Sequence, residues 1–116
     1  MSDDILQRYY AAMRTGASAE ADMMALFTDD AVYIEPFSGE DAAVGIEQVR
    51  TRLQQGWEFP LPDLELEVTS MSVTADGARS CWTCRSPALP DGEVSGVDLF
   101  EFSDGKVSRL EVRFDE

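Results

Sequence analysis

The chain contains no histidine, so any acid–base chemistry has to come from other side chains. The missing imidazole excludes Ser-His-Asp and Cys-His nucleophilic catalysis as well as imidazole metal sites. Carboxylates, tyrosines, lysine and cysteines remain as groups that can accept or donate protons. The search for a functional site therefore starts with acids and phenols that the sequence pattern places on apolar faces.

One carboxyl group shares an apolar strand face near the C-terminus. Asp98, Phe100 and Phe102 are two residues apart, so they lie on the same face of a strand. An acid on such a face costs several kcal/mol unless it is protonated or hydrogen-bonded. We therefore single out Asp98; the alternative is that the strand begins after this residue and its carboxylate is solvated.

Glu35 and Tyr9 are two further groups that can carry a proton, and both lie on elements that are expected to meet Asp98. Tyr33 and Glu35 share one face of a short predicted strand that ends at Pro36, and Tyr9 lies on the apolar stripe of a predicted helix. We expect Tyr9, Glu35 and Asp98 to converge at one end of the core. The ordinary alternatives are a solvated acid before the proline and a packing tyrosine with a wet hydroxyl.

The wider pattern predicts helices first and strands later, with turns at Asp76-Gly77 and Ser103-Asp104-Gly105. The expected helices cover 3–15, 18–27 and 46–55, and the expected strands cover 31–35, 63–74, 79–86, 94–102 and 106–114, with a loop-rich region at 37–44. A phase shift in the apolar alternation predicts a bulge near Ser70. This order predicts an α+β fold with one mixed or antiparallel sheet and helices grouped on one face.

The two cysteines have the CxxC spacing of redox and zinc sites, but they lie in a predicted strand. Cys81 and Cys84 would point to opposite faces of that strand, which disfavours a disulfide between them. Zinc needs two further soft ligands, which the sequence lacks. We expect two half-buried free cysteines in a reducing compartment.

Composition and charge narrow the function classes. The 116 residues, 44% of them hydrophobic, are typical of a single globular domain, here 1–116. A net charge of −14 repels phosphate backbones and anionic lipid, so we expect neither nucleic-acid nor membrane partners. No apolar run suffices for a membrane span, and the acidic N-terminus is unlike a signal peptide, so a cytoplasmic location is expected. The pairs Asp29-Asp30 and Glu40-Asp41 lie beside turns and are interpreted as solvated charge; no metal and no cofactor are expected.

Three segments, 27–36, 45–49 and 96–107, resemble in order and spacing a superfamily that contains nuclear transport factor 2, ketosteroid isomerase and SnoaL-type polyketide cyclases. The resemblance covers nearly the whole chain. It implies the cone-shaped NTF2-like (cystatin-like) fold, in which three N-terminal helices pack in a strongly curved mixed or antiparallel sheet. It also implies a homodimer formed through the outer face of the sheet.

The ketosteroid-isomerase branch offers the most similar site. Arg8-Tyr9 resembles the helix segment with that family's oxyanion tyrosine, Glu35 stands where the family has its general-base aspartate, and Asp98 stands where it has a protonated aspartic acid. The resemblance implies that Glu35 removes a proton next to a carbonyl group while Tyr9 and Asp98 donate hydrogen bonds to the enolate oxygen. The same site is a standard example of pKa tuning.

The ligand implied by this resemblance is a small apolar carbonyl compound in an apolar pocket. The expected pocket residues are Tyr33, Phe27, Leu53, Trp82, Phe100, Leu110, Val112 and Phe114. The chain departs from the isomerase pattern because its base is Glu, and because Phe27 and Leu53 replace tyrosines of the oxyanion network. These changes argue against steroid isomerisation and leave a related isomerase, lyase or cyclase.

Other function classes remain open at this point. The same fold serves non-catalytic ligand binding, and it serves protein-binding dimers such as nuclear transport factor 2 itself. A related family hydrolyses epoxides with an Asp-Arg-Asp set around a water molecule, but the sequence places no arginine inside the cone. A proton-transfer enzyme is the favoured hypothesis, with a ligand-binding or interaction domain as the alternative.

Overall fold

The computed structural model describes residues 2–36, 41–58 and 62–114. Three α-helices are present in these ranges, and two single-turn 3-10 helices accompany them. The α-helices are α1 (Ser2–Thr15), α2 (Glu20–Met24) and α3 (Ile46–Glu58), and the 3-10 helices are η1 (Ala17–Ala19) and η2 (Pro90–Gly92).

Six strands form one mixed sheet with the order β2-β1-β6-β5-β4-β3. The strands are β1 (Phe27–Ile34), β2 (Ala43–Val44), β3 (Glu65–Val73), β4 (Gly77–Arg85), β5 (Glu93–Ser103) and β6 (Lys106–Phe114). β1 and β6 run parallel, whereas the other neighbouring strands are antiparallel. The α+β class and the mixed sheet expected from the sequence are confirmed.

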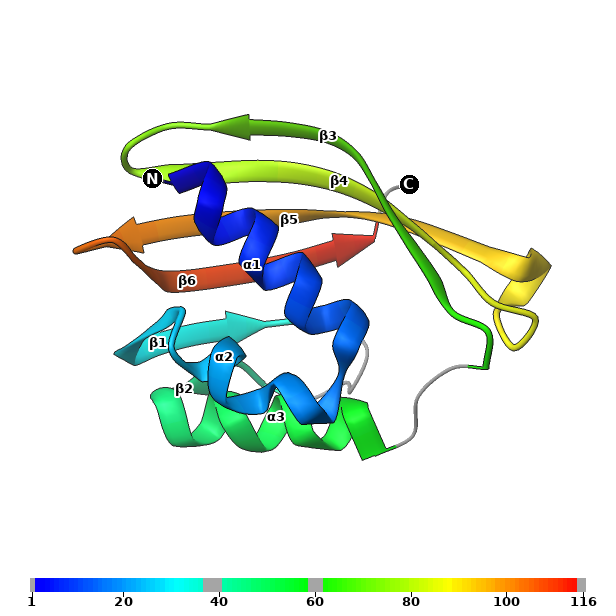
Figure 1. The fold of residues 1–116 in the computed structure, drawn as a ribbon, viewed down its shortest axis with the longest axis horizontal. Helices are drawn as coiled ribbons and strands as arrows, with labels where there is room; N and C mark the ends of the chain where they lie inside the picture. Colours follow the sequence, from blue (N-terminus) through cyan, green and yellow to red (C-terminus); the bar gives the residue numbers. More distant parts are fainter. Residues whose placement is uncertain (1, 37–40, 59–61, 115–116) are drawn as a thin grey trace.

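The helices cover one face of the sheet, and the core lies between the two layers. In Figure 1, α1 crosses obliquely over the central strands, while α3 runs along the edge formed by β1 and β2. The buried apolar residues form one cluster that includes Leu6, Met23, Val49 and Leu110. Among the residues expected to form the site, Asp98 is buried on β5, Tyr9 is buried on α1 and Leu53 is buried on α3.

Three predicted boundaries differ from the structure by three residues or more. The first strand was expected to begin at 31, but β1 begins at Phe27. The second helix was expected over 18–27, but α2 ends at Met24 because the following residues join the sheet: Phe27 pairs with Val107 at the start of β1. The third helix was expected to end before Gly56, but α3 continues to Glu58. Packing of Trp57 against the core offsets the cost of about 1 kcal/mol that glycine imposes within a helix.

Two local features position the strands as the sequence predicts. The register between β3 and β4 shifts between Val68 and Ser70, which confirms the predicted bulge. Gly45 has φ of +91°, a conformation that other residues rarely adopt, and its N–H donates to the carbonyl of Ala31. This turn brings α3 directly beside β1. The predicted loop at 37–44 contains β2 at its end, and 37–40 lie outside the described residues.

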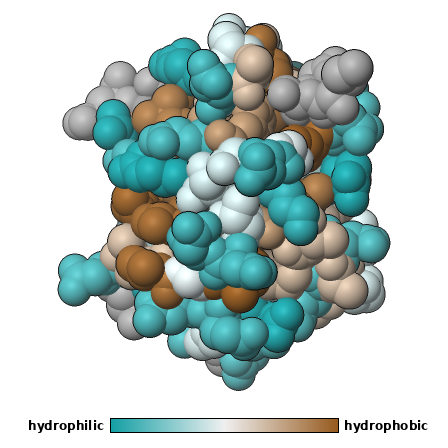
Figure 2. Space-filling view, turned by 90° about the vertical axis from the view of Figure 1, so that its left-hand side faces the viewer, coloured by the Kyte–Doolittle hydropathy of each residue, from teal (hydrophilic) through white to brown (hydrophobic). Residues whose placement is uncertain are grey.

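The molecular surface has no extended apolar area on the side shown in Figure 2, where hydrophobic patches alternate with hydrophilic residues. The exposed large apolar side chains among the described residues are Val44, Leu64, Met71 and Phe114. None of the helices in the described part of the chain is long and apolar enough to cross a bilayer.

Candidate functional site

Asp98 is the centre of a buried hydrogen-bonded cluster. Its side chain is almost fully buried on the inner face of β5. The Tyr10 hydroxyl donates to Oδ2 at 2.5 Å, and the Trp82 indole N–H donates to Oδ1 at 2.9 Å. The Tyr10 hydroxyl also contacts the hydroxyl of Ser80. Both carboxyl oxygens of Asp98 therefore have a partner within the protein.

Burial raises the pKa of Asp98 to about 6, although the hydrogen bonds from Tyr10 and Trp82 favour the charged form and offset part of the effect. At neutral pH roughly nine-tenths of such a group is ionised. An ionised carboxylate only accepts hydrogen bonds. The direction of the shift agrees with the expected apolar environment, but at neutral pH Asp98 is mainly an acceptor.

Gly96 makes room for the Trp82 ring. A Cβ atom at Gly96 would lie 2.3 Å from the indole ring and 2.5 Å from the carbonyl oxygen of Arg113. The missing side chain lets the indole lie across β5, next to the strand position two residues before Asp98. The orientation of the indole N–H toward Asp98 thus depends on a glycine in the neighbouring strand.

Glu35 is the second buried acid, and the positive charge of Arg52 compensates the negative charge of its carboxylate. Its carboxylate follows the end of β1 and is 7% exposed. Arg52 on α3 donates from Nη1 to Glu35 Oε1 at 2.8 Å and from Nη2 to the carbonyl oxygen of Asp41 at 2.7 Å. The guanidinium therefore ties the base expected from the sequence to both α3 and the chain before β2.

Arg52 is an arginine inside the fold, which the sequence analysis did not place. The Asp-Arg-Asp set of the epoxide-hydrolysing family needs an arginine shared by two acids. Among the described residues, Arg52 forms ion pairs with Glu35 and not with Asp98. The structure therefore supplies one acid–arginine pair and a separate acid that is held by neutral donors.

Tyr9 and Tyr33 are buried phenols without a hydrogen-bond partner among the described residues. Tyr9 is 2% exposed and packs edge-to-face on Tyr10 and Phe100, with ring centroids 5.0 and 5.4 Å apart. Tyr33 is 5% exposed on β1. The hydrogen bonds found in the described structure use the hydroxyl of Tyr10 and neither of these two. Their donor capacity is thus unused.

Electrostatics place both phenols near the buried acids. Burial raises the pKa of Tyr9, and the negative charge of Asp98 raises it further. Burial also raises the pKa of Tyr33, with additional contributions from Glu35 and then Asp98, while Arg52 opposes the shift. Both hydroxyls remain protonated at neutral pH and can donate a hydrogen bond. Tyr33 is the group that senses both carboxylates.

The strand register shows how the two acids face each other. Asp98 pairs with Val112 across β5 and β6, and Ile34 pairs with Glu111 across β1 and β6. Glu35, one residue after Ile34, therefore lies level with Val112 on the other side of β6. Two strand spacings separate the acids, which is roughly 10 Å. Glu35 and Asp98 thus lie on the same side of the sheet, two strands apart.

The remaining residues expected to line a pocket are buried with one exception. The buried ones are Phe27, Leu53, Trp82, Phe100, Leu110 and Val112, together with Tyr33. Phe114 is 44% exposed because it ends β6 at the rim of the sheet. These side chains form a continuous apolar wall around the two phenols, so the interior contacts available to a ligand are apolar apart from the acids and hydroxyls.

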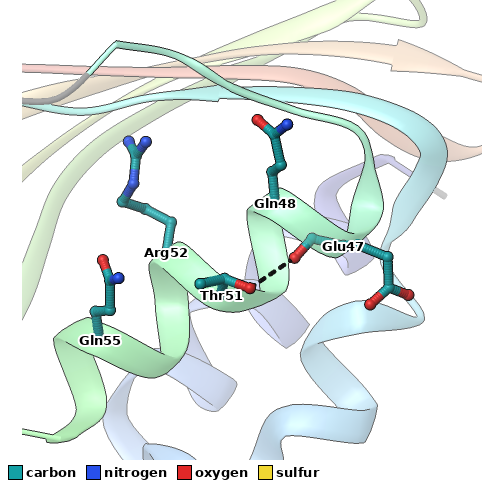
Figure 3. A pocket seen from close by; sticks show the side chains of 5 residues that line it. All are labelled: Glu47, Gln48, Thr51, Arg52 and Gln55. Atoms are coloured by element: carbon teal, nitrogen blue, oxygen red, sulfur yellow. Dashed lines mark hydrogen bonds between the residues drawn. The ribbon is translucent and has the colours of Figure 1, made fainter.

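Two surface hollows stand out in the described structure, and neither is bordered by Tyr9, Tyr33 or Asp98. The larger, about 340 Å³, lies along α3 and is lined by Glu47, Gln48, Thr51, Arg52 and Gln55. Figure 3 shows Gln48, Arg52 and Gln55 rising from the same side of α3, with Glu47 turned away. The smaller hollow lies beside Arg85 at the far end of β4. Arg52 thus connects a surface hollow to the buried Glu35.

Sequence reasoning missed Tyr10, Ser80 and Arg52. Tyr10 had a signal, because it follows Leu6 by four residues on a helix and so belongs to the same apolar stripe. Ser80 alternates with Trp82 along β4, which also places it on the inner face. Arg52 gave no signal, since an arginine next to Leu53 on a surface helix is ordinarily solvent-exposed.

The described residues contain no group of three or more cysteine or acidic side chains that can hold a metal ion. Cys81 and Cys84 are both free. Burial raises the pKa of the Cys84 thiol, and the charge of Asp98 adds to the effect. A neutral thiol is a weak nucleophile, so the chemistry of this interior rests on carboxylates and phenols.

The sequence matches the model of the SnoaL-like domain over residues 6–110. The chain belongs to the SnoaL-like family. The match includes Tyr10, Glu35, Trp82 and Asp98. No curated protein matches the sequence of this SnoaL-like chain.

Solved structures share the fold of this SnoaL-like protein. An NTF2-like protein of unknown function from Burkholderia pseudomallei has a TM-score of 0.80 at 16% identity, covering 98% of this chain and 90% of its own. A candidate ketosteroid isomerase from Kribbella flavida has a TM-score of 0.75 at 23% identity, covering 97% and 76%. A candidate SnoaL-like polyketide cyclase from Jannaschia sp. CCS1 has a TM-score of 0.76 at 21% identity, covering 98% and 85%. These identities establish the NTF2-like fold and not the reaction.

Proposed function

We propose that this SnoaL-like protein is an enzyme that transfers a proton at the carbon next to the carbonyl group of a small apolar compound. The single observation that carries the proposal is that Glu35 and Asp98 are two buried acids on one inner face, on either side of Val112. Buried ionisable groups are expensive and are concentrated at functional sites. Isomerase, cyclase and lyase reactions of this kind begin with the same proton abstraction.

The roles follow from the charge of each group. Glu35 accepts the proton of the carbon–hydrogen bond, the electron pair of that bond forms the carbon–carbon double bond of the enolate, and the carbonyl π electrons move to oxygen. Tyr9 donates a hydrogen bond to that oxygen as negative charge develops on it. A donor already fixed in an apolar interior does not need to reorganise in the transition state.

Arg52 supports this role for Glu35. A carboxylate buried without compensation costs several kcal/mol, so an unpaired base would not remain charged inside the fold. The guanidinium, which also bonds Asp41, holds one carboxylate oxygen in place. Misplacement of a base by 1 Å costs about a hundredfold in rate, so the clamp is part of the catalytic arrangement.

The apolar surroundings define the ligand class. Phe100, Leu110 and Val112 surround the phenols, and the described residues offer no cation beside them other than Arg52. A ligand reaching Tyr9 and Tyr33 has to displace side chains that pack there, because neither surface hollow extends to them. A compact apolar body with one carbonyl oxygen meets both conditions. The similarity to a candidate isomerase and a candidate cyclase supports the reaction class and leaves the substrate open.

A proton-exchange experiment tests the proposal. The probe is 2-tetralone, an apolar ketone with acidified protons next to its carbonyl, dissolved in D₂O and followed by proton NMR. We expect the wild-type protein to accelerate deuterium incorporation and the Glu35→Gln variant to lose at least about a hundredfold of that acceleration, because the amide cannot accept the proton.

The matched control is Glu58→Gln, which makes the same change at an exposed glutamate at the end of α3. This variant should exchange at the wild-type rate. Equal exchange by wild-type protein and buffer would contradict the proposed reaction. Saturable binding of the ketone without exchange would assign the protein to the alternative class of non-catalytic ligand-binding domains.

A further inference from the structure

The resemblance to ketosteroid isomerase implies that Asp98 is the second donor to the enolate oxygen, but the hydrogen bonds around Asp98 argue against it. Tyr10 and Trp82 each donate to one of its two oxygens. Tyr10 is itself held by Ser80. A carboxylate that accepts two internal hydrogen bonds has no proton to offer a ligand, and its nearest neighbours are donors that a ligand would have to replace.

Tyr33, unlike Asp98, carries a proton that it can donate to a ligand oxygen. Its side chain is 5% exposed, and its hydroxyl carries a proton at neutral pH and bonds no other group among the described residues. Tyr33 precedes Glu35 by two residues, so the two side chains leave the sheet on the same face. Burial and then the charges of both Glu35 and Asp98 raise the pKa of the phenol, and on this face of the sheet Tyr33 lies in the row next to the one that contains Val112 and Asp98.

Tyr9 and Tyr33 approach the same interior from opposite layers. Tyr9 hangs from α1 over the ring of Phe100, which pairs with Leu110 across β5 and β6. Tyr33 pairs with Leu110 across β1 and β6. The two phenols therefore stand over one row of the sheet, and, after burial, Tyr33 is among the groups that raise the pKa of Tyr9. A ligand oxygen placed above Leu110 would have one phenol on the helix side and the other on the strand side.

We infer that Tyr33, together with Tyr9, donates the hydrogen bonds that hold the ligand oxygen, and that Asp98 is a positioning residue within the Tyr10–Trp82–Ser80 cluster. This inference rests on the proton-transfer function proposed above and makes Tyr33 a catalytic residue of that reaction. It also narrows the ligand to one whose oxygen accepts two hydrogen bonds from neutral phenols, that is, a ketone, an enol or a phenol, and not an organic acid.

The chain contains three tyrosines, so the assignment is tested with a matched Tyr→Phe series and Asp98→Asn. Two readouts are used: deuterium exchange of 2-tetralone, and binding of 2-naphthol, a phenol that mimics the enol, followed by its fluorescence. We expect Tyr33→Phe and Tyr9→Phe each to slow exchange by about a hundredfold, the usual effect of losing one such donor. Both should weaken naphthol binding about tenfold or more, because a buried acceptor loses its partner.

Tyr10→Phe and Asp98→Asn should affect naphthol binding less than Tyr33→Phe does. Thermal unfolding gives the complementary result: Tyr33→Phe should leave the melting temperature unchanged, because its hydroxyl bonds nothing in the described structure, whereas Tyr10→Phe should lower it. If the role of Tyr33 were purely structural, Tyr33→Phe would lower the melting temperature and leave naphthol binding unchanged. An unchanged melting temperature would show that the Tyr33→Phe protein is folded, so that its loss of binding can be assigned to the hydroxyl.

The outcomes separate this inference from the proposed function. If Glu35→Gln abolishes exchange while Tyr33→Phe leaves exchange and naphthol binding intact, the reaction stands and the assignment of Tyr33 is overturned. If naphthol binding depends on Tyr33 and no exchange is detected, the donor pair stands and proton transfer is overturned. Weaker naphthol binding by Asp98→Asn than by Tyr33→Phe would return the donor role to Asp98. If the wild-type protein neither binds naphthol nor exchanges the ketone, both proposals are overturned.

Discussion

The two buried acids of this protein are compensated in opposite ways. Glu35 faces the charged guanidinium of Arg52, whereas Asp98 accepts hydrogen bonds from two neutral donors, Tyr10 and Trp82. A full positive charge cancels the charge of its partner, while neutral donors only reduce the cost of burial. The pKa of Asp98 therefore rises to about 6, within the range that solution conditions reach. One fold thus holds an acid paired with a cation and an acid bonded by neutral donors, roughly 10 Å apart.

This difference also separates two roles. The ion pair keeps a charged base next to α3, beside the surface hollow that Arg52 lines. The Asp98 cluster lies deeper, with Ser80 fully buried beneath Tyr10. The outer position suits a group that exchanges its proton with substrate, and the inner position suits a group that holds neighbouring side chains in place.

Breaking the ion pair should have the largest effect on stability. Arg52→Gln leaves the carboxylate of Glu35 without its cation and should lower the free energy of unfolding by roughly 3–5 kcal/mol, as measured by urea denaturation. Arg50→Gln on the same helix is the control, because Arg50 pairs with Glu20 and Glu47 at a more exposed position. The control should cost about 1 kcal/mol or less. Equal losses for the two variants would show that burial does not distinguish these pairs.

The titration of Asp98 should have the next largest effect. Because its pKa is about 6 in the folded protein and 3.8 in the unfolded reference, the folded state binds the proton more tightly. This group stabilises the fold below about pH 4, and the contribution of about 3 kcal/mol is lost as the pH rises to about 6.

The Asp98→Asn variant isolates the contribution of Asp98 to the pH dependence of the free energy of unfolding, because the asparagine side chain does not titrate. Urea denaturation of both proteins at a series of pH values between 4 and 7 should show a decline in the wild type that is absent from the variant. At neutral pH the variant should be as stable as the wild type or more stable. A variant that retains the same decline would assign it to other carboxyl groups, and a large loss of stability would show that the charged form is stabilised by its partners.

The smallest stability effect compares two tyrosines that differ only in their hydrogen bonds. Tyr10→Phe removes the contacts to Asp98 and Ser80 and should cost roughly 1–3 kcal/mol, because a buried acceptor is left without its donor. Tyr33→Phe should change the free energy of unfolding by about 0.5 kcal/mol or less. Denaturation at pH 7 measures both. A larger loss for Tyr33→Phe would reveal an internal partner for its hydroxyl.

The predicted homodimer through the outer face of the sheet stays a prediction, as do the cytoplasmic location and the single-domain boundary. The outer face of β5 and β6 carries an ion-pair network in which Arg109 contacts Glu101 and Glu111, and Arg113 contacts Glu111. These pairs are partly exposed, so each contributes little to the stability of the isolated chain.

Much of the sheet and part of the site could be predicted from the sequence. Alternation with a period of two residues placed Asp98 on the face of Phe100, and Glu35 on the face of Tyr33, before any contact was known. The boundaries of α2 and α3 were less predictable, because the pairing of Phe27 with Val107 and the packing of Trp57 depend on residues far away in the chain. Local propensity contains no record of such contacts.

The amino-acid sequence by itself determined that this protein works without histidine, that its acids at 35 and 98 lie on apolar faces, and that a tyrosine-bearing helix covers them. Only the tertiary structure decided which tyrosine meets which acid. Tyr9 and Tyr10 are neighbours on α1 and point about 100° apart, so the rotation of the helix about its axis decides which of them meets Asp98. The same holds for Arg52, whose charge reaches Glu35 because Gly45 turns α3 back beside β1. The apolar pattern of the sequence determines which face of a helix or strand a side chain lies on. The way the helices pack on the sheet determines which residues it contacts.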